Sequence, residues 1–369
     1  MAKLRIILSG GGTGGHIYPA VSVGEALKRK YGDDVEILFV GAEGRMEMER
    51  IPALGYRIEG LPVAGLQRKL SVKNFALPYK VVKSVSRAKK VIREFGPDAV
   101  VGFGGYASAP VLWAAQKLKV PTVVQEQNSY AGVTNKIVGK KAQRVCVAYD
   151  GMERFFPAGR IVKTGNPLRS HFGDISSKKV EALNYFGLEG GKPVILLVGG
   201  SLGTRTLNNA VMRWLDEIAE KQEMQLIWQT GKYYEAGLNE ELKGRELPGI
   251  WRGAFIDRMD LAFAAADVVV SRAGASTVSE LSLVGKPTIF VPSPNVAEDH
   301  QTKNAQALSS VGAAMLIPDN EAVERVIPAA IELAADATQM EEMRKNILAL
   351  GIADSADRVV TAIEDVLKK

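Results

Sequence analysis

The sequence predicts an α/β protein built from two doubly wound domains, each with a parallel β-sheet. Short β-branched apolar runs alternate with amphipathic helical stretches along the 369 residues, which is typical of repeated strand–helix units. A chain of this length exceeds what one hydrophobic core comfortably serves. The turn-rich stretch "KTGNPLRSHF" at 163–172 interrupts the alternation. We therefore expect one domain over 1–164 and a second over 165–351.

The expected elements follow from hydrophobic periodicity. In the first half, strands are predicted at 4–10, 35–41, 97–105, 121–127 and 144–149, with helices at 20–31 and 108–119. In the second half, strands are predicted at 193–200, 224–231, 267–274 and 287–292, with helices at 206–221 and 276–285. A last helix over 355–369 could pack on either domain.

Charge is distributed unequally along the chain. Residues 1–165 contain 26 Lys and Arg against 13 Asp and Glu, whereas the remainder contains 21 against 28. The first half therefore suits an anionic partner, and nucleic acid, an acidic membrane surface and a phosphorylated substrate are all open at this point. The one cysteine, Cys146, lies in an apolar run and is expected to be a buried, inert thiol. With too short an apolar run for a signal peptide, the sequence fits a cytoplasmic protein.

Three glycine-rich stretches follow predicted strands. The first, "SGGGTGGHIYPA" at 9–20, contains the pattern G-x-G-x-x-G of dinucleotide sites. The second strand, however, ends "LFVGAEG" with Val40 and Gly41 at its tip, and only Glu43 is a late candidate for the acidic residue that holds a ribose. The second stretch, "GFGGYASAP", carries Tyr106, and the third, "LLVGGSLGTRTLN", carries Ser201. Glycines let a backbone approach a ligand, and helix N-termini attract anions, so these loops indicate a diphosphate site.

Two residues in these patterns have both a structural and a functional interpretation. His16 begins a predicted helix, where it could be structural or act as a general base near neutral pH. Glu280 follows Ser276 and Thr277 in "RAGASTVSE", which fits either a capping box or a site for phosphate and sugar hydroxyls. The sequence has no Walker A motif, zinc spacing or Asp-x-Asp pair, so helix dipoles, hydroxyls and basic side chains should neutralise a bound diphosphate.

The order of the motifs carries a resemblance. "GGTGGH", "GFGGY", "QEQN", "GNPLR", "GGSLG", "RAGASTVSE" and "DHQTKNA" occur as they do in the MurG family of bacterial N-acetylglucosaminyltransferases, from about residue 4 to about 350. The resemblance implies a GT-B fold with an interdomain cleft, and a final helix (about 352–369) that returns to the first domain. It also implies inverting, metal-independent transfer of GlcNAc from UDP-GlcNAc to the MurNAc C4 hydroxyl of lipid I, which is undecaprenyl-pyrophosphoryl-MurNAc-pentapeptide. The product is lipid II, and no cofactor is needed.

The resemblance also assigns residues. In the first domain, which would face acceptor and membrane, His16 resembles the general base, Asn128 a donor-sugar and catalytic residue and Tyr106 an acceptor-side residue. Donor contacts are expected at Thr13, Gly14 and Gly15. In the second domain, which would bind UDP-GlcNAc, the expected contacts are Arg169, Ser201, Ile256, Ala275, Ser276, Thr277, Val278, Ser279, Glu280 and Gln301. Thr204 stands where the family commonly has alanine, and His300 receives no role.

The resemblance implies a peripheral protein on the cytoplasmic face of the plasma membrane. Residues 73–95 carry seven Lys and Arg and one acid among apolar positions, and we expect Phe75, Leu77 and the lysines to contact an anionic surface, while Val81, Val85, Ala88 and Ile92 face the sheet. Other cell-wall synthesis or division proteins are candidate partners; nucleic acid is not expected. A UDP-GlcNAc 2-epimerase and a nucleotide-sugar binding module are the alternatives.

Overall fold

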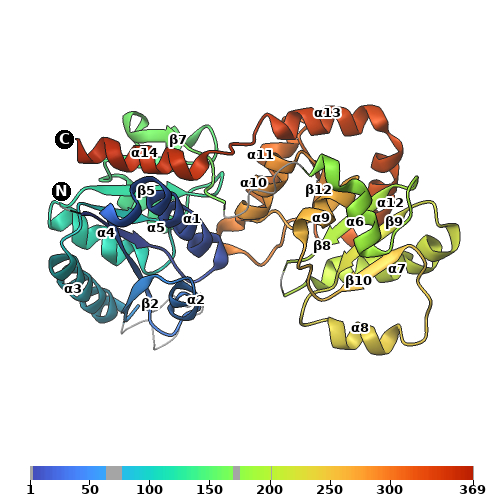
Figure 1. Ribbon diagram of the computed structural model, residues 1–369, viewed down its shortest axis with the longest axis horizontal. Coiled ribbons are helices and arrows are strands. Elements are labelled where there is room, and N and C mark those ends of the chain that lie inside the picture. Colours follow the sequence, from blue (N-terminus) through green and yellow to red (C-terminus); the bar gives the residue numbers. More distant parts are fainter. Residues whose placement is uncertain (1–2, 64–76, 169–174, 201, 369) are drawn as a thin grey trace. The chain divides into compact units, whose positions relative to one another are not determined.

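The computed structural model describes residues 3–63, 77–168, 175–200 and 202–368. The chain forms two compact units, which are coloured along the sequence in Figure 1. Unit 1 comprises Met1–Ser170 and Ile352–Lys369, and unit 2 comprises His171–Gly351. Among the described residues, no helix is both long enough and apolar enough to cross a bilayer.

Unit 1 is built on a seven-stranded sheet with the order β3-β2-β1-β4-β5-β6-β7, and all of its strand pairs are parallel. Its strands are β1 (Leu4–Ser9), β2 (Val35–Ala42), β3 (Arg57–Leu61), β4 (Ala99–Gly102), β5 (Thr122–Glu126), β6 (Arg144–Val147) and β7 (Ile161–Lys163). Its helices are α1 (Gly14–Tyr31), α2 (Glu47–Ala53), α3 (Leu77–Phe95), α4 (Ser108–Lys117), α5 (Val133–Gly139) and α14 (Ser355–Leu367).

Unit 2 is built on a six-stranded parallel sheet with the order β10-β9-β8-β11-β12-β13. Its strands are β8 (Val194–Val198), β9 (Gln225–Gln229), β10 (Ile250–Gly253), β11 (Val268–Ser271), β12 (Thr288–Phe290) and β13 (Met315–Leu316). Its helices are α6 (Lys179–Phe186), α7 (Arg205–Lys221), α8 (Glu235–Glu241), α9 (Met259–Ala265), α10 (Ala275–Val284), α11 (His300–Ser309), α12 (Ala322–Ala335) and α13 (Ala337–Leu348).

The predicted α/β class with two parallel sheets is confirmed, and every predicted strand is present. The sequence missed β3, β7, β10 and β13, which are the edge strands of the two sheets. An edge strand is covered less completely than a central one, so it need not be a continuous apolar run. The expected burial of Cys146 is also confirmed, and burial raises the pKa of its thiol to about 12.

The last helix, α14, packs in unit 1. Val359, Val360 and Ile363 lie in the same buried cluster as residues of β1 and α1. At its surface, Asp357 accepts a hydrogen bond from Arg29 at 2.9 Å, and Glu364 pairs with Lys30 at 2.5 Å. The contacts are therefore a buried apolar stripe with ion pairs along its margin.

The order of the strands in each sheet determines where the glycine-rich loops lie. β1 lies between β2 and β4, and β8 lies between β9 and β11, so each sheet reverses its strand order at its first strand. Ligands of doubly wound sheets bind at the carboxyl ends of strands beside such a reversal. The glycine-rich stretches of the sequence follow β1, β4 and β8 at these edges.

Candidate functional site

The first glycine loop lies between β1 and α1. Gly12 has a φ of +86°, which favours glycine, and Thr13 is the extended residue before the helix. His16 lies in the first turn of α1, where its backbone N–H donates to the Thr13 carbonyl at 3.1 Å. Its ring nitrogen Nδ1 is 3.2 Å from the Gly11 carbonyl oxygen and 3.2 Å from the Thr13 hydroxyl. The imidazole is thus held by the loop itself.

The second glycine loop, after β4, packs directly against the first. A Cβ at Gly105 would overlap the carbonyl oxygen of Gly11, and a Cβ at Gly104 would lie 3.0 Å from Nε2 of His16. Both glycines have positive φ, +94° at Gly104 and +80° at Gly105. Tyr106, the next residue, is 51% exposed. The structure therefore brings His16 and the loop that carries Tyr106 to one edge of the sheet.

A buried carboxylate orients Asn128 at the end of the neighbouring strand, β5. Oε1 of Glu126 accepts hydrogen bonds from the backbone and the side-chain nitrogen of Asn128, at 3.0 and 3.2 Å. Oε2 accepts from Gly132 at 3.0 Å and from the Asn135 amide at 2.9 Å. The Gln127 amide donates to the Phe103 carbonyl at 2.8 Å and so ties this segment to the second glycine loop.

In unit 2, the loop after β8 is held by a neutral side chain. Oε1 of Gln229 accepts from the N–H of Gly199 at 3.1 Å, and its amide nitrogen donates to the Gly200 carbonyl at 2.8 Å. The Thr204 hydroxyl donates to the Gly199 carbonyl at 2.9 Å, which gives the residue that departs from the family pattern a role in the loop.

Arg272 joins several loops at the carboxyl edge of unit 2. Its guanidinium donates to the carbonyls of Val291 and Pro292, at 2.8 and 3.0 Å, and pairs with Asp319 at 2.6 Å. Asp319 in turn accepts from the Thr206 hydroxyl at 3.1 Å. The site in unit 2 thus has a cation held in place beside the glycine loop.

The segment Ala275–Glu280 forms the first turns of α10, and the capping-box interpretation is wrong. The N-cap is Gly274, and no side chain caps the helix, because Ser276 and Thr277 already lie inside it. The first turn of a helix leaves backbone N–H groups without intrahelical acceptors, which suits an anion. Burial raises the pKa of the Glu280 carboxyl to about 7.

The remaining predicted residues differ in what they can offer a ligand. Ile256 is 3% exposed. Oε1 of Gln301 accepts from the N–H of Ser293 at 2.9 Å, and the neighbouring His300 ring contacts Glu298 at 3.0 Å. Arg169 and Ser201 lie outside the described residues.

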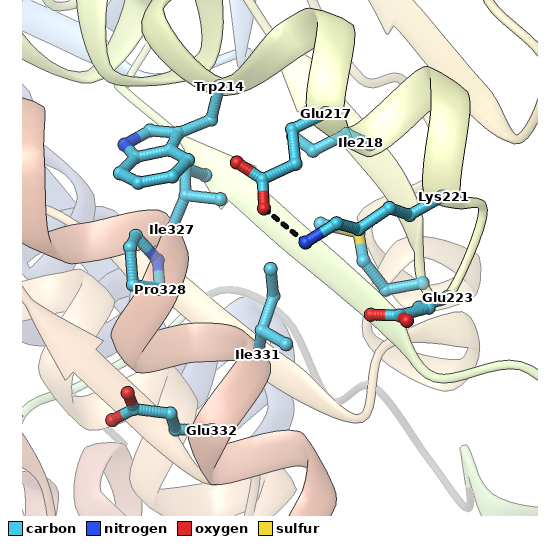
Figure 2. Close-up of a pocket in the computed structure, with 10 residues that line it drawn as sticks. Trp214, Glu217, Ile218, Lys221, Glu223, Ile327, Pro328, Ile331 and Glu332 are labelled. Carbon is cyan, nitrogen blue, oxygen red and sulfur yellow. Dashed lines mark hydrogen bonds and ion pairs between the residues drawn. The ribbon is translucent and has the colours of Figure 1, made fainter.

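Unit 2 also has an apolar groove between α7 and α12, away from the predicted site residues. Figure 2 shows Trp214, Ile327 and Ile331 around it, with the Glu217–Lys221 ion pair at its margin. Its volume is about 220 Å³. None of the glycine loops lines this groove.

Comparison with known proteins decides the family. Residues 6–147 match the glycosyltransferase family 28 N-terminal domain, and residues 194–359 match the family's C-terminal domain. A protein of Parabacteroides distasonis is 52% identical over 369 residues, covering 100% of both chains. The chain belongs to glycosyltransferase family 28.

The names of the family 28 relatives agree with one another. The Parabacteroides protein is a UDP-N-acetylglucosamine--N-acetylmuramyl-(pentapeptide) pyrophosphoryl-undecaprenol N-acetylglucosamine transferase. A Porphyromonas gingivalis protein of the same name is 51% identical and covers 100% of this chain and 97% of its own. The crystal structure of Acinetobacter baumannii MurG has a TM-score of 0.77 at 27% identity, covering 98% of this chain and 99% of its own. The GT-B fold is thereby confirmed.

A UDP-GlcNAc 2-epimerase from Neisseria meningitidis has a TM-score of 0.67 at 13% identity, covering 99% of this chain and 100% of its own. A likeness at that identity shows the fold alone. The family 28 assignment rests instead on the full-length relatives.

Sequence reasoning missed the buried and partly buried side chains that hold the loops. Glu47, Gln229 and Arg272 each bind backbone atoms of a loop at a sheet edge. Their partners are distant in sequence, so no local pattern distinguishes these residues from ordinary polar ones. Glu126 could have been found, because it stands inside the "QEQN" motif.

Proposed function

We propose that the protein transfers GlcNAc from UDP-GlcNAc to the C4 hydroxyl of MurNAc in lipid I, with inversion and without a metal ion, to form lipid II. The family and the names of its full-length relatives support the donor and the acceptor. In this proposal, unit 1 binds the acceptor and unit 2 binds the donor nucleotide.

The observation that carries the mechanism is the setting of His16. In this proposal the ring proton of His16 is on Nδ1, because the Gly11 carbonyl oxygen, 3.2 Å away, can only accept a hydrogen bond. Nε2 lies on the side of Gly104, where a Cβ on that glycine would be 3.0 Å from it. A general base in this state removes the proton of the acceptor hydroxyl while that oxygen attacks the anomeric carbon, and UDP leaves from the opposite face.

Donor binding in unit 2 would use the loops after β8 and β11. The diphosphate would meet the N-terminus of α10, through Ala275 to Ser279, and the glycine loop, with Ser201 as a further donor. Arg169 belongs to unit 1, and its donor contact stays a prediction. Glu280 would accept from the ribose hydroxyls, and Gln301 would reach the sugar. Fixed N–H dipoles stabilise the charge that develops on the leaving diphosphate.

The activity is tested with labelled UDP-GlcNAc, a lipid I analogue and excess EDTA. We expect a β-linked disaccharide product from the wild type, and a rate about 10²- to 10⁴-fold lower for His16→Ala with UDP affinity retained. Loss of all wild-type product in EDTA, with recovery on adding Mg²⁺, would contradict the metal-independent mechanism. Equal rates for both proteins would remove His16 as the base. Formation of UDP-ManNAc without acceptor would favour the epimerase.

We further propose that unit 1 docks on the anionic cytoplasmic face of the plasma membrane. A hollow of about 610 Å³ is lined by the partly exposed Trp113 and Ile137 and by Lys89, Lys117, Lys119 and Lys141. The helices α3 and α4, which contribute to it, pack on each other (Figure 1). Apolar and basic side chains that line one hollow suit an anionic lipid surface.

Two of the side chains predicted to contact the membrane, those of Phe75 and Leu77, lie outside the described residues. On the rest of α3, Ala88 and Ile92 are buried in the sheet-facing cluster, with Val85 packed against it.

Membrane docking is tested by flotation with phosphatidylglycerol vesicles. The triple change Lys117→Gln, Lys119→Gln, Lys141→Gln should weaken binding about a hundredfold, since each basic residue near an anionic surface contributes about 1 kcal/mol. The matched control changes Lys232, Lys243 and Lys345 of unit 2 to Gln and should bind like the wild type. Equal binding of both triple variants at low salt would contradict this docking face.

A further inference from the structure

Glu47, the first residue of α2, is a carboxylate buried beside the first glycine loop, and the proposed mechanism leaves it without a function. Its side chain is 1% exposed. Oε1 accepts the N–H of Ala42 at 3.0 Å, and Oε2 accepts the N–H of Gly12 at 3.2 Å. No Lys or Arg of the described chain pairs with it. Burying a carboxylate without a cation to pair with it costs free energy. The presence of Glu47 at this position therefore calls for an explanation.

The space around Glu47 is shaped by two glycines. A Cβ at Gly11 would overlap Oε1 of Glu47, and a Cβ at Gly41 would lie 2.6 Å from its Cγ. Neither glycine has a positive φ, so backbone conformation does not require glycine at either position. It is the close approach of the Glu47 side chain that requires glycine at both positions.

The hydrogen bonds of Glu47 and His16 meet on one peptide group. The N–H of Gly12, which donates to Glu47, and the C=O of Gly11, which lies 3.2 Å from Nδ1 of His16, belong to the same planar amide. A negative charge at the N–H end of an amide polarises it and makes the carbonyl oxygen a stronger acceptor. The peptide group therefore connects the carboxylate to the imidazole.

We propose that Glu47 is the positioning carboxylate of His16 and acts through the Gly11–Gly12 peptide group. This inference rests on the proposed function, in which His16 is the general base. When Nε2 takes the proton of the acceptor hydroxyl, an imidazolium forms whose Nδ1–H donates to the Gly11 oxygen, and the charge of Glu47 stabilises it. An orienting acid does the same by direct contact in a Ser-His-Asp triad.

The test compares Glu47→Gln with the wild type, using Glu49→Gln on the exposed face of the same helix as the matched control. We expect kcat of Glu47→Gln to fall about ten- to a hundredfold while KM for UDP-GlcNAc changes less than twofold. The acid limb of the pH profile should move to lower pH. In an NMR titration of the histidine rings, the proton affinity of His16 should fall roughly three- to tenfold. Glu49→Gln should match the wild type.

An unchanged His16 titration in a folded Glu47→Gln protein would overturn the proposal. If that variant does not fold, the ¹⁵N shifts of His16 in the wild type decide: a proton on Nδ1 is expected, and a proton on Nε2 would overturn the proposal. The titration and the ¹⁵N shift measurement are both made without turnover, so their outcome does not depend on whether the protein has the proposed activity. Wild-type transfer that survives in His16→Ala would remove the base assignment instead.

Discussion

The loop after β1 in unit 1 and the loop after β8 in unit 2 are both glycine-rich turns between a central strand and a long helix. Each has a backbone N–H that donates to a buried side chain. In unit 1 that acceptor is the carboxylate of Glu47, and in unit 2 it is the amide of Gln229. In unit 2, Arg272 also lies beside the loop, with its Nε 3.5 Å from the Thr204 hydroxyl.

This difference in charge teaches what each loop is suited to bind. A carboxylate behind the first loop repels an anion and favours a protonated imidazole, whereas a neutral amide behind the second loop does not repel a diphosphate. In the proposed function, the same local structure serves two kinds of chemistry, and we infer that the buried partner selects between them.

The largest effect is expected from substitutions that disrupt each of the two glycine loops in turn. Gly105→Ala would drive a Cβ into the Gly11 carbonyl, and Gly203→Ala would drive one into the Thr230 carbonyl, with φ values of +80° and +81°. Both changes should reduce transfer more than a hundredfold. Only Gly203→Ala should lose UDP affinity, by at least tenfold. Calorimetry with UDP measures this, with thermal melting to check folding, and loss of UDP affinity in Gly105→Ala would contradict the division of roles.

A smaller effect is expected from exchanging the charge behind the second loop. Gln229→Glu should weaken UDP binding about tenfold, because it places a carboxylate near the proposed diphosphate and removes the hydrogen bond to the Gly200 carbonyl. Gln339→Glu, on the exposed surface of α13, makes the same charge change elsewhere and should bind UDP like the wild type. Equal affinities for both variants would argue against an electrostatic role for residue 229.

The smallest effect is expected at Glu280, a largely buried carboxyl group on α10 of unit 2. Its pKa is raised to about 7, so the folded state holds its proton more tightly than the unfolded chain, and stability decreases as pH rises from about 4.5 to 7. Glu280→Gln should therefore stabilise the protein by about 1 to 2 kcal/mol more at pH 8 than at pH 5. Urea unfolding at both pH values measures this, and equal increments would show that burial does not destabilise the ionised carboxyl.

Central and edge strands differ in how much of their position the sequence reveals. The strand β8, "VILLV", is almost wholly buried in the middle of its sheet and stands out as an apolar run. The edge strand β3, "RIEGL", has an exposed or half-buried residue at every position but the last. Its pairing with β2 depends on a neighbour rather than on its own composition.

The same limit applies to the site. Glycine loops and the order of motifs are local features, so His16, Tyr106 and Asn128 could be named from the sequence. Glu47 could not, because "GAEGRMEMER" contains several glutamates and nothing separates Glu47 from the exposed Glu49. Its burial, its hydrogen bonds to Gly12 and Ala42 and the close approach of Gly11 and Gly41 distinguish it.

The sequence by itself determined the α/β class, the central strands, the glycine loops and the family, because burial and backbone conformation leave their mark on neighbouring residues. The tertiary structure decided that α14 packs on α1, that the loops after β1 and β4 touch, and which buried side chain stands behind each loop. These contacts join residues far apart in the chain, and they depend on the order of strands in the sheet, which no local pattern encodes.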